Sequence, residues 1–279
     1  MTLRAVLTLY VAHLLTDFIF QTTRLVQQKK NGHVIGYFKH GAIPYLRAAG
    51  GCMFPARRSI FVASQLVVIG LTLVHLLIDF CKAQLSKSRI AADSAVAFIV
   101  DQCAHFITVV WAACLIEQTP LTNVARGGLG VMHEQSDRIL FLLVVYVLVI
   151  FACGYLIRLV TKPLMRHIGL ASPHTHDSPP RETPAQLSNA GMYIGWLERF
   201  LVLTALLLHS PATVGLIIAA KSVARFPQFD REQFAEYFLI GTLLSICTAL
   251  VGGVVLMKVF FGNFALPQET AFTLRRDLF

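Results

Sequence analysis

Charged residues are scarce in this sequence, and long stretches contain none. Asp, Glu, Lys and Arg make up 14% of the 279 residues, whereas a soluble domain of this size carries roughly a quarter. Apolar residues make up 56%, and the mean hydropathy is +0.64. This composition excludes an ordinary soluble enzyme and places the chain among integral membrane proteins.

Several signatures of soluble chemistry are also missing. The sequence has no phosphate-binding loop, dinucleotide fingerprint or serine nucleophile elbow. Its six cysteines form no CxxC pair, so we interpret them as packing residues rather than a disulfide framework. The net charge is +9 without a nucleic-acid-binding motif, and the basic residues flank apolar runs, as the positive-inside rule predicts. We therefore expect membrane lipids as partners, and no nucleic acid.

The apolar runs predict an all-α fold, a polytopic transmembrane helix bundle. A helix needs about 20 apolar residues to cross roughly 30 Å of hydrocarbon. The first run contains His13 and Asp17 and lacks a cleavage site, so we interpret it as a retained span rather than a signal peptide. Runs of sufficient length lie at about 2–21, 59–81, 92–116, 138–160 and 235–258.

Two further apolar regions are less regular. Residues 41–54 form a short run, and 190–224 are interrupted at 209–211 by His, Ser and Pro. If 41–54 crosses or enters the membrane, the basic clusters after three of the spans all face the cytoplasm, and the amino terminus lies outside. We interpret 190–224 as a helical hairpin, with a single kinked span as the alternative. The prediction is about 7–8 membrane segments.

A polar stretch divides the chain. Residues 171–188, ASPHTHDSPPRETPAQLS, are rich in Pro, Ser and Thr and predict a cytoplasmic linker. The linker separates an N-terminal membrane half, 1–170, from a C-terminal half, 189–279. Gly191 and Gly195 have a GxxxG-like spacing, which suits helix packing within one chain or in a homo-oligomer.

Three predicted spans each carry a histidine and an aspartate four residues apart, and such residues share one helix face. The order is His then Asp in the first two, and Asp then His in the third, whose helix is predicted to run in the opposite direction. All three pairs are therefore predicted to lie at a similar depth on the cytoplasmic side, with the histidines deeper. The pairs are His13 and Asp17 in AHLLTDFIFQ, His75 and Asp79 in VHLLIDFCK, and Asp101 and His105 in VDQCAHF.

Buried charge of this kind indicates a function. An acidic residue near the bilayer centre costs roughly 2.5–3.5 kcal/mol on insertion scales. Imidazole and carboxylate ligands together suit a divalent metal such as zinc, which offsets the burial of the carboxylates and can activate water. We predict that Asp17, Asp79 and Asp101 are also the catalytic residues, one of them as general base. The predicted metal ligands are His13, Asp17, His75, Asp79, Asp101 and His105.

Other polar residues accompany these pairs. Gln21 falls on the same broad helix face as the first pair, and Lys82 falls between His75 and Asp79 in angle. Gln102 adjoins Asp101, and His40 lies at the predicted cytoplasmic end of 41–54. We predict them as additional polar or anion-binding residues. For His40 an interfacial position is the alternative.

A second polar group lies near the predicted membrane ends of the C-terminal half. It comprises Glu198 and Arg199 in GWLERF, Lys221 and Arg225 in AAKSVARF, and Glu236 in AEYFLIGT. One interpretation is interfacial ion pairing. The other is a seat for a phosphate or another anion made by the two basic residues of AAKSVARF, which the two glutamates hold in place.

These segments resemble the bacterial integral-membrane domain-of-unknown-function family 3307. The resemblance rests on AHLLTDFIFQ, VHLLIDFCK and DQCAHF in the N-terminal half. In the C-terminal half it rests on GMYIGWLERFLV, AAKSVARF and EYFLIGTLLS. It implies a shared fold in the bacterial inner membrane but supplies no activity.

Three functions fit the residues. The first is a membrane-embedded, metal-dependent hydrolase acting on a lipid or lipid-linked anionic substrate at the cytoplasmic side. The second is a proton- or cation-coupled transporter or channel, in which the same histidines and aspartates form a relay and 190–224 is a discontinuous helix. The third is a non-enzymatic membrane interaction protein whose polar cluster locks helices together.

Overall fold

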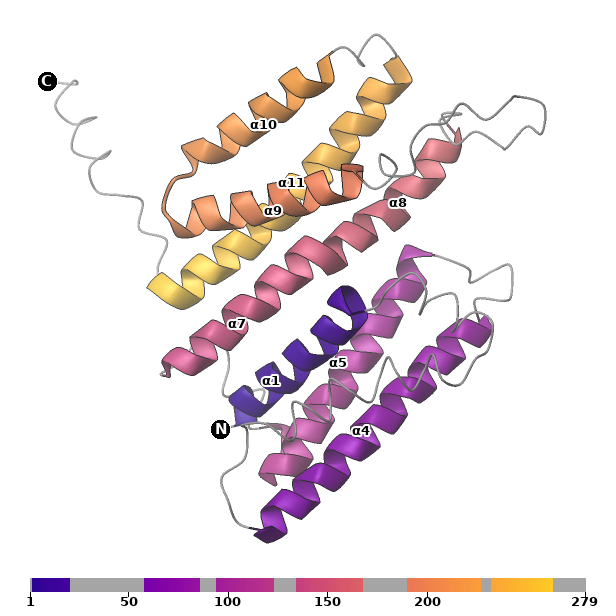
Figure 1. The fold of residues 1–279 in the computed structure, drawn as a ribbon, viewed down its shortest axis with the longest axis vertical. Helices are drawn as coiled ribbons and strands as arrows, with labels where there is room; N and C mark the ends of the chain where they lie inside the picture. The colour runs from indigo at the N-terminus through magenta and orange to yellow at the C-terminus, as the bar shows by residue number, and fades with distance from the viewer. Residues whose placement is uncertain are drawn as a thin grey trace, which may run out of the picture.

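In the computed structural model, every regular element of the described residues is a helix (Figure 1). The described residues are 2–20, 58–85, 94–122, 134–167, 190–226 and 232–262. Two helices contain a π-helical turn, η1 and η2. The elements are α1 (Thr2–Leu14), η1 (Leu15–Ile19), α4 (Arg58–Leu85), α5 (Ala95–Glu117), α7 (Gln135–Val147), η2 (Leu148–Ala152), α8 (Cys153–His167), α9 (Ala190–Leu207), α10 (Ala212–Arg225) and α11 (Glu232–Phe261).

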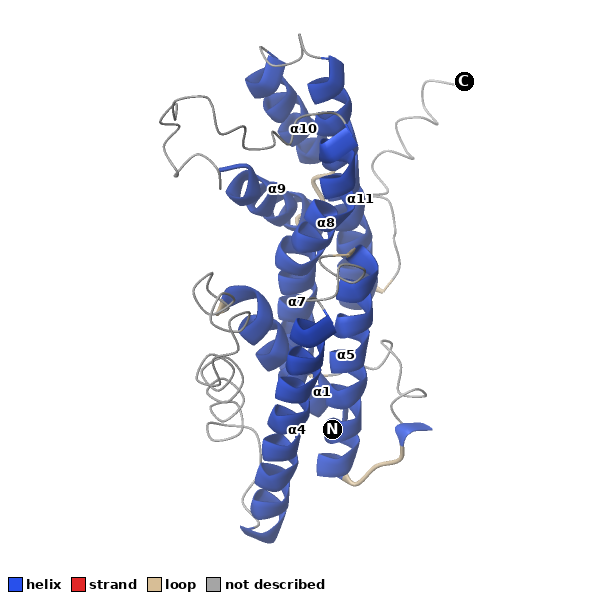
Figure 2. Cartoon of the chain, turned by 90° about the vertical axis from the view of Figure 1, so that its right-hand side faces the viewer, coloured by secondary structure: helices blue, strands red, loops and turns tan. Residues whose placement is uncertain are grey.

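One long helix joins two groups of helices. Figure 1 shows α1, α4 and α5 on one side, α9, α10 and α11 on the other, and the continuous helix α7–η2–α8 between them. α7 packs against α1, while η2 and α8 pack against α9 and α11. Seen from the side in Figure 2, the helices form a narrow layer. A single long helix therefore contacts both groups.

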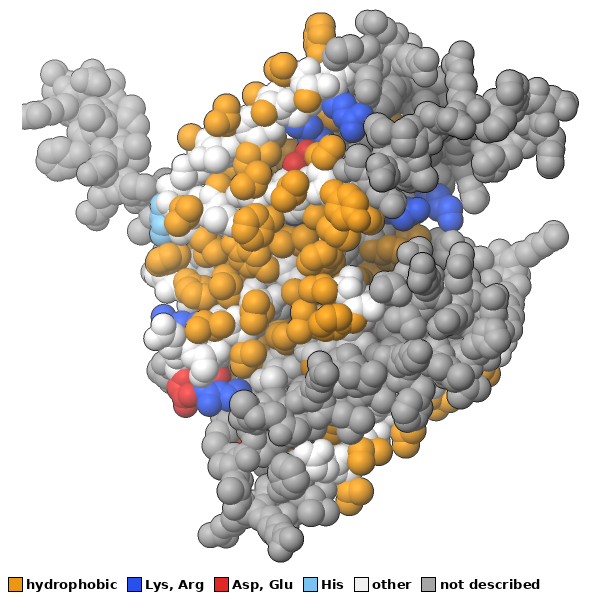
Figure 3. Space-filling model, in the orientation of Figure 1, with side chains coloured by type: hydrophobic (Ala, Val, Ile, Leu, Met, Phe, Trp, Pro, Cys, Tyr) orange, Lys and Arg blue, Asp and Glu red, His pale blue; other side chains and the backbone are white. Residues whose placement is uncertain are grey.

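The described helices include membrane-spanning candidates. Four stretches are long and apolar enough to cross a membrane: Ser64–Leu85, Ala95–Glu117, Gln135–Pro163 and Ala235–Phe261. Large apolar side chains such as Leu73, Ile107 and Val251 are more than 60% exposed. In Figure 3 apolar side chains cover most of the described surface, and charged ones gather mainly at its two ends. A face of this kind suits lipid rather than water.

The predicted long spans agree with the observed helices. Those predicted at 59–81, 92–116, 138–160 and 235–258 correspond to α4, α5, α7–η2–α8 and α11. The helices α1 with η1, α9 and α10 are shorter, and 41–54 lies outside the described residues, as does 171–188. Among the described residues, four helices are therefore candidates to span a membrane, and the predicted total of 7–8 segments is not confirmed.

The chain turns back in the region predicted as a hairpin. α9 ends at Leu207, His209 has a left-handed backbone with φ of 55°, and α10 begins at Ala212. Pro211 stands directly before α10, a position at which its missing N–H removes no helical hydrogen bond. α9 and α10 pack against each other, so the hairpin rather than a single kinked span is observed.

Small residues allow α11 to approach its neighbours closely. A Cβ atom on Gly253 would lie 2.3 Å from Leu206 Cδ1, and one on Gly252 would lie 2.6 Å from Val149 Cγ2. Both distances are far below van der Waals contact. These two glycines therefore set the spacing between α11, α9 and η2.

Candidate metal centre

The three predicted pairs meet in one buried cluster between α1, α4 and α5. The ring centroids of His13, His75 and His105 lie 4.4–5.3 Å from one another. All three histidines are at most 1% exposed. The reversed order of the third pair predicted this meeting, because α5 lies antiparallel to α4 and brings His105 to the depth of His75.

Two carboxylates lie between the histidine rings. Asp17 Oδ1 is 3.5 Å from His75 Nε2, and Asp17 Oδ2 is 3.8 Å from His13 Nε2. Asp79 Oδ2 is 3.9 Å from His75 Nε2, and its Oδ1 is 4.0 Å from His105 Nε2. Each carboxylate thus faces two imidazoles from different helices. Asp17 lies within the π-helical turn η1, and such turns are frequent at functional sites.

The hydrogen bonding of His105 fixes which of its ring nitrogens carries the proton. Its Nδ1 lies 2.8 Å from the backbone oxygen of Asp101. A carbonyl oxygen only accepts, so Nδ1 carries the proton and Nε2 presents a lone pair. Histidines that bind metals are commonly oriented in this way, by donating their other ring nitrogen to a carbonyl. His105 Nε2 makes no hydrogen bond within the described part of the chain.

The candidate ligand atoms form two sets that share His105. One atom each from His13, Asp17, His75 and His105 lie within 4.8 Å of one another, and the same holds for Asp79, Asp101 and His105. Zinc bound tetrahedrally at about 2.1 Å separates its ligands by about 3.4 Å. Side-chain movements of about 1 Å would therefore bring the first set to zinc-binding geometry.

Asp101 differs from the other two aspartates in its partners. Lys82 Nζ lies 2.6 Å from Asp101 Oδ2, and Gln102 Nε2 donates to the same oxygen at 3.2 Å. The Asp101 side chain is 4% exposed and that of Lys82 is 45% exposed. Lys82 and Gln102 thus lie beside the cluster, as predicted, and their contact is with Asp101. The predicted binding of an anion by Lys82 stays a prediction.

An apolar layer closes the deep side of the cluster. One to two turns deeper in each helix lie Leu9 in α1, Val68 and Leu71 in α4, and Val109 in α5, all at most 5% exposed. They belong to one continuous apolar core. The cluster therefore opens toward the aspartates and is closed below the histidines.

The second predicted polar group is only partly assembled. Lys221 Nζ pairs with Glu198 Oε2 at 2.6 Å, in agreement with the suggestion that Glu198 holds Lys221. Arg225 is partly buried near the end of α10, whereas Glu236 is exposed on α11 and makes no ion pair with a described residue. The anion-binding role of this group stays a prediction. Gln21 and His40 lie outside the described residues.

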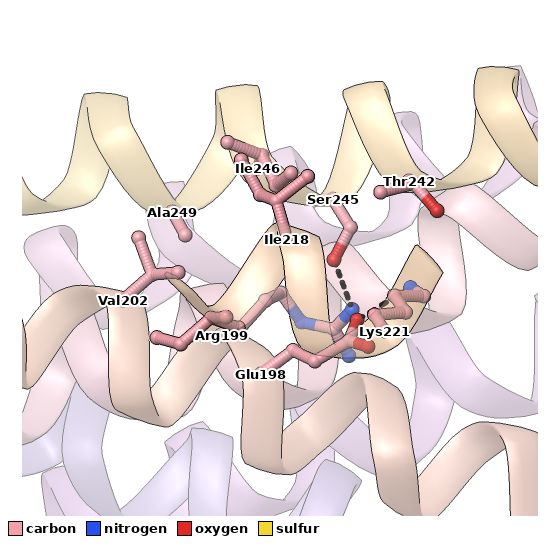
Figure 4. A pocket seen from close by; sticks show the side chains of 10 residues that line it. Glu198, Arg199, Val202, Ile218, Lys221, Thr242, Ser245, Ile246 and Ala249 are labelled. Atoms are coloured by element: carbon pink, nitrogen blue, oxygen red, sulfur yellow. Dashed lines mark hydrogen bonds and ion pairs between the residues drawn. The ribbon is translucent and has the colours of Figure 1, made fainter. Parts of the chain in front are cut away.

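Arg199 is buried in the bundle, in contrast to the predicted interfacial ion pair. It is 5% exposed. Its Nε and Nη2 donate to the backbone oxygen of Ile150 in η2, at 3.2 and 2.7 Å. Its Nη1 donates to Ser245 Oγ at 3.1 Å (Figure 4). A Cβ on Gly154 would lie 2.3 Å from Arg199 Nη2. Sequence reasoning missed this role, although a glycine and a serine within apolar helices were the available signal.

A small pocket adjoins Arg199. Glu198, Lys221, Thr242 and Ser245 line it together with apolar side chains of α9, α10 and α11 (Figure 4). Its volume is about 10 Å³, which is room for about one water molecule. Glu198 Oε1 is buried and makes no hydrogen bond within the described residues. A single water molecule is therefore the occupant that the pocket fits.

The comparison with known families concerns the N-terminal half. Residues 5–126 match the model of the family described as protein of unknown function DUF3307. The match confirms the resemblance of the N-terminal segments, covers all three His–Asp pairs, and ends before the C-terminal segments. No curated protein and no solved structure matches the chain.

Proposed function

We propose that this chain is a membrane-embedded, metal-dependent hydrolase of the bacterial inner membrane. Its substrate is a lipid or lipid-linked anion, bound at the cytoplasmic side of a bundle with 7–8 membrane segments. The observation that carries the proposal is the buried convergence of His13, His75, His105 and Asp17 from three helices, with ligand atoms within 4.8 Å of one another. Three imidazoles and one carboxylate suit zinc.

The chemistry follows from the position of the remaining carboxylate. A divalent ion held by these four residues would need a fifth coordination position for water; it would lower the pKa of that water and so supply a nucleophile at neutral pH. Asp79 faces His75 and His105 from the open side, so it is placed to accept a proton as general base. Asp101 is held by Lys82 and positions His105 through its backbone oxygen.

The exposure of the surrounding residues supports a lipid substrate. The histidines are at most 1% exposed, Asp17 and Asp79 are 10–11% exposed at the side chain, and Lys82 is 45% exposed. Around this opening, Ile19, Phe20 and Phe80 expose large apolar side chains. A cation beside exposed apolar side chains suits a substrate with an anionic head group and an acyl or prenyl chain.

The apolar residues below the histidines favour an enzyme over a proton or cation relay. A proton or cation pathway needs polar groups or water on both sides of the cluster. The residues below the histidines are instead mainly apolar: Leu9, Val68, Leu71 and Val109. The buried hydroxyl of Thr72 at this level donates to the Val68 backbone oxygen. The transporter alternative therefore has less support from the geometry, and an ion-flux measurement provides its test.

The test is the metal content of the purified protein. Cells are grown with zinc, manganese and iron, and bound metals are measured after exhaustive dialysis. We expect about one divalent ion per chain, lost in His13→Ala and His75→Ala. The matched control is His209→Asn, because His209 is an exposed histidine of the hairpin turn and Asn tolerates its left-handed backbone. Wild type without stoichiometric metal would sink the proposal.

A second experiment measures the hydrolysis of defined lipids in mixed micelles. Phosphatidic acid is incubated with the metal-loaded protein, and inorganic phosphate is measured. A phosphodiester lipid, phosphatidylglycerol, is assayed in parallel by following its cleavage products. We expect one of the two to be hydrolysed and Asp79→Asn to remove turnover while retaining metal. Metal binding without hydrolysis, together with cation flux into liposomes, would favour the transporter.

A further inference from the structure

The cluster contains two sets of candidate metal ligands, and the ammonium group of a lysine lies against one of them. The two candidate sets overlap only at His105: one adds His13, Asp17 and His75, and the other adds Asp79 and Asp101. Hydrolytic sites with two such sets commonly hold two metal ions about 3.5–4 Å apart. In this chain the second set already has a cation against it, because Lys82 Nζ lies 2.6 Å from Asp101 Oδ2.

The side chain of Lys82 is held in that position. It follows Asp79 by three residues on α4, so both face the same side of the helix. Its ammonium lies 5.9 Å from the ring centroid of Phe98, on α5 one turn before Asp101. Gln102 donates to the same Asp101 oxygen. Two contacts with α5, to Asp101 and to Phe98, thus hold the Lys82 ammonium beside the carboxylate.

We propose that Lys82 occupies the place of a second metal ion, so that the centre binds one divalent cation and a tethered ammonium completes the set. This inference rests on the proposed function, since it requires a metal at the first set. The first ion lies with His13, His75, His105 and Asp17, and Lys82 neutralises Asp101 in the second set.

The charge of the buried centre supports a single ion. Three aspartates bring three negative charges, and the histidines are neutral when they act as ligands. One divalent ion together with Lys82 balances these charges. Without Lys82 a single ion leaves one buried carboxylate uncompensated, which is costly in a low-dielectric interior. Two ions together with Lys82 would leave an excess of two positive charges.

The test removes the ammonium and counts metal ions. Lys82→Met keeps the length and apolar stem of the side chain, and Lys82→Arg retains the charge as the matched control. At saturating manganese we expect one ion per chain in wild type and Lys82→Arg, and two in Lys82→Met. Adding Asp101→Asn to Lys82→Met should return the count to one, because the second set then lacks its carboxylate.

Electron paramagnetic resonance of the manganese-loaded proteins provides a second readout. Wild type should give the six-line spectrum of an isolated ion, and Lys82→Met the spectrum of two coupled ions. Two ions in wild type would overturn the inference without help from a variant, so a poorly folding Lys82→Met does not leave it untested. One ion in folded Lys82→Met, or two in Lys82→Met with Asp101→Asn, would also overturn it. No metal in wild type would instead refute the proposed function.

Discussion

The described part of the molecule contains two buried polar centres, and they differ in how many of their polar atoms are hydrogen-bonded. In the C-terminal half, Arg199 donates three hydrogen bonds to Ile150 and Ser245, and Glu198 is paired with Lys221. In the N-terminal half, neither ring nitrogen of His13 nor Nε2 of His105 makes a hydrogen bond within the described residues. A buried polar group normally has a partner. Apart from Glu198 Oε1, the first centre finds its partners among the described residues, whereas these imidazole nitrogens of the second centre do not.

This contrast suggests that one centre stabilises the fold and the other binds a metal. If it is correct, substitutions in the N-terminal cluster should change metal content, and substitutions around Arg199 should change the free energy of unfolding. The Arg199→Met experiment measures both quantities, so a mixed result there would refute the distinction.

The largest expected effect is the loss of metal from His105→Ala. Removing a partner that only orients a ligand costs roughly 10–100-fold in affinity, and removing the ligand itself costs more. We therefore expect zinc affinity to fall at least about 100-fold, measured by competition with a chelating dye. Unchanged affinity would show that the cluster binds metal without His105, and would refute the ligand set.

Arg199→Met should lower the free energy of unfolding by about 2–3 kcal/mol, because hydrogen bonds from a charged donor are lost and the Ile150 oxygen is left buried without them. The measurement is denaturation of the metal-free protein in detergent, followed by circular dichroism. Metal content should stay at the wild-type value. A loss of metal as large as that of His105→Ala would mean that the two centres act as one.

Gly154→Ala should destabilise the protein by about 1–2 kcal/mol, because the new methyl group would displace the Arg199 guanidinium. The control is Gly241→Ala in α11, where no atom lies within 4 Å of the added Cβ and stability should hold or rise slightly. In the Arg199→Met background Gly154→Ala should have little effect. Equal effects in both backgrounds would exclude a collision with Arg199 as the cause.

The smallest effect is expected for Arg4→Gln at the amino-terminal end of α1. Arg4 pairs with Glu134 and Asp137 at the start of α7, and its side chain is 41% exposed. Exposed pairs of this kind contribute about 0–1 kcal/mol and weaken with salt. Denaturation at low and high salt should show a small difference that disappears at high salt. A loss above that range would mean that this pair, rather than the apolar contact of α1 with α7, holds the first helix.

The long helices and the His–Asp cluster were predictable from the sequence. Lipid-facing side chains are apolar whatever their neighbours are, so runs such as 138–160 identify helices without knowledge of the fold. The meeting of the three pairs followed from helix direction, because only an antiparallel α5 brings His105 to the depth of His75. Both conclusions use one-dimensional patterns and need no side-chain detail.

The contacts of Lys82 and Arg199 could not be predicted in the same way. Lys82 was expected beside the cluster. Its ion pair with Asp101, in place of the predicted contact with a bound anion, depends on the spacing of α4 and α5. Arg199 was expected at an interface, because a charged residue in an apolar helix is usually placed there. Its burial depends on the Ile150 carbonyl in η2, and a π-helical turn has no characteristic composition from which it can be predicted.

The turn η2 lets the central helix absorb an extra residue. The Cys153 N–H bonds to the Leu148 oxygen five residues back, so this turn holds one residue more than an α-helical turn. Deleting Val149 would therefore convert it to an α-helical turn and leave α8 facing α9 and α11 much as before. The same deletion within α7 or α8 would rotate the following residues by about 100° around the helix axis. A single-codon deletion should therefore disrupt the assembly less in η2 than elsewhere in the central helix.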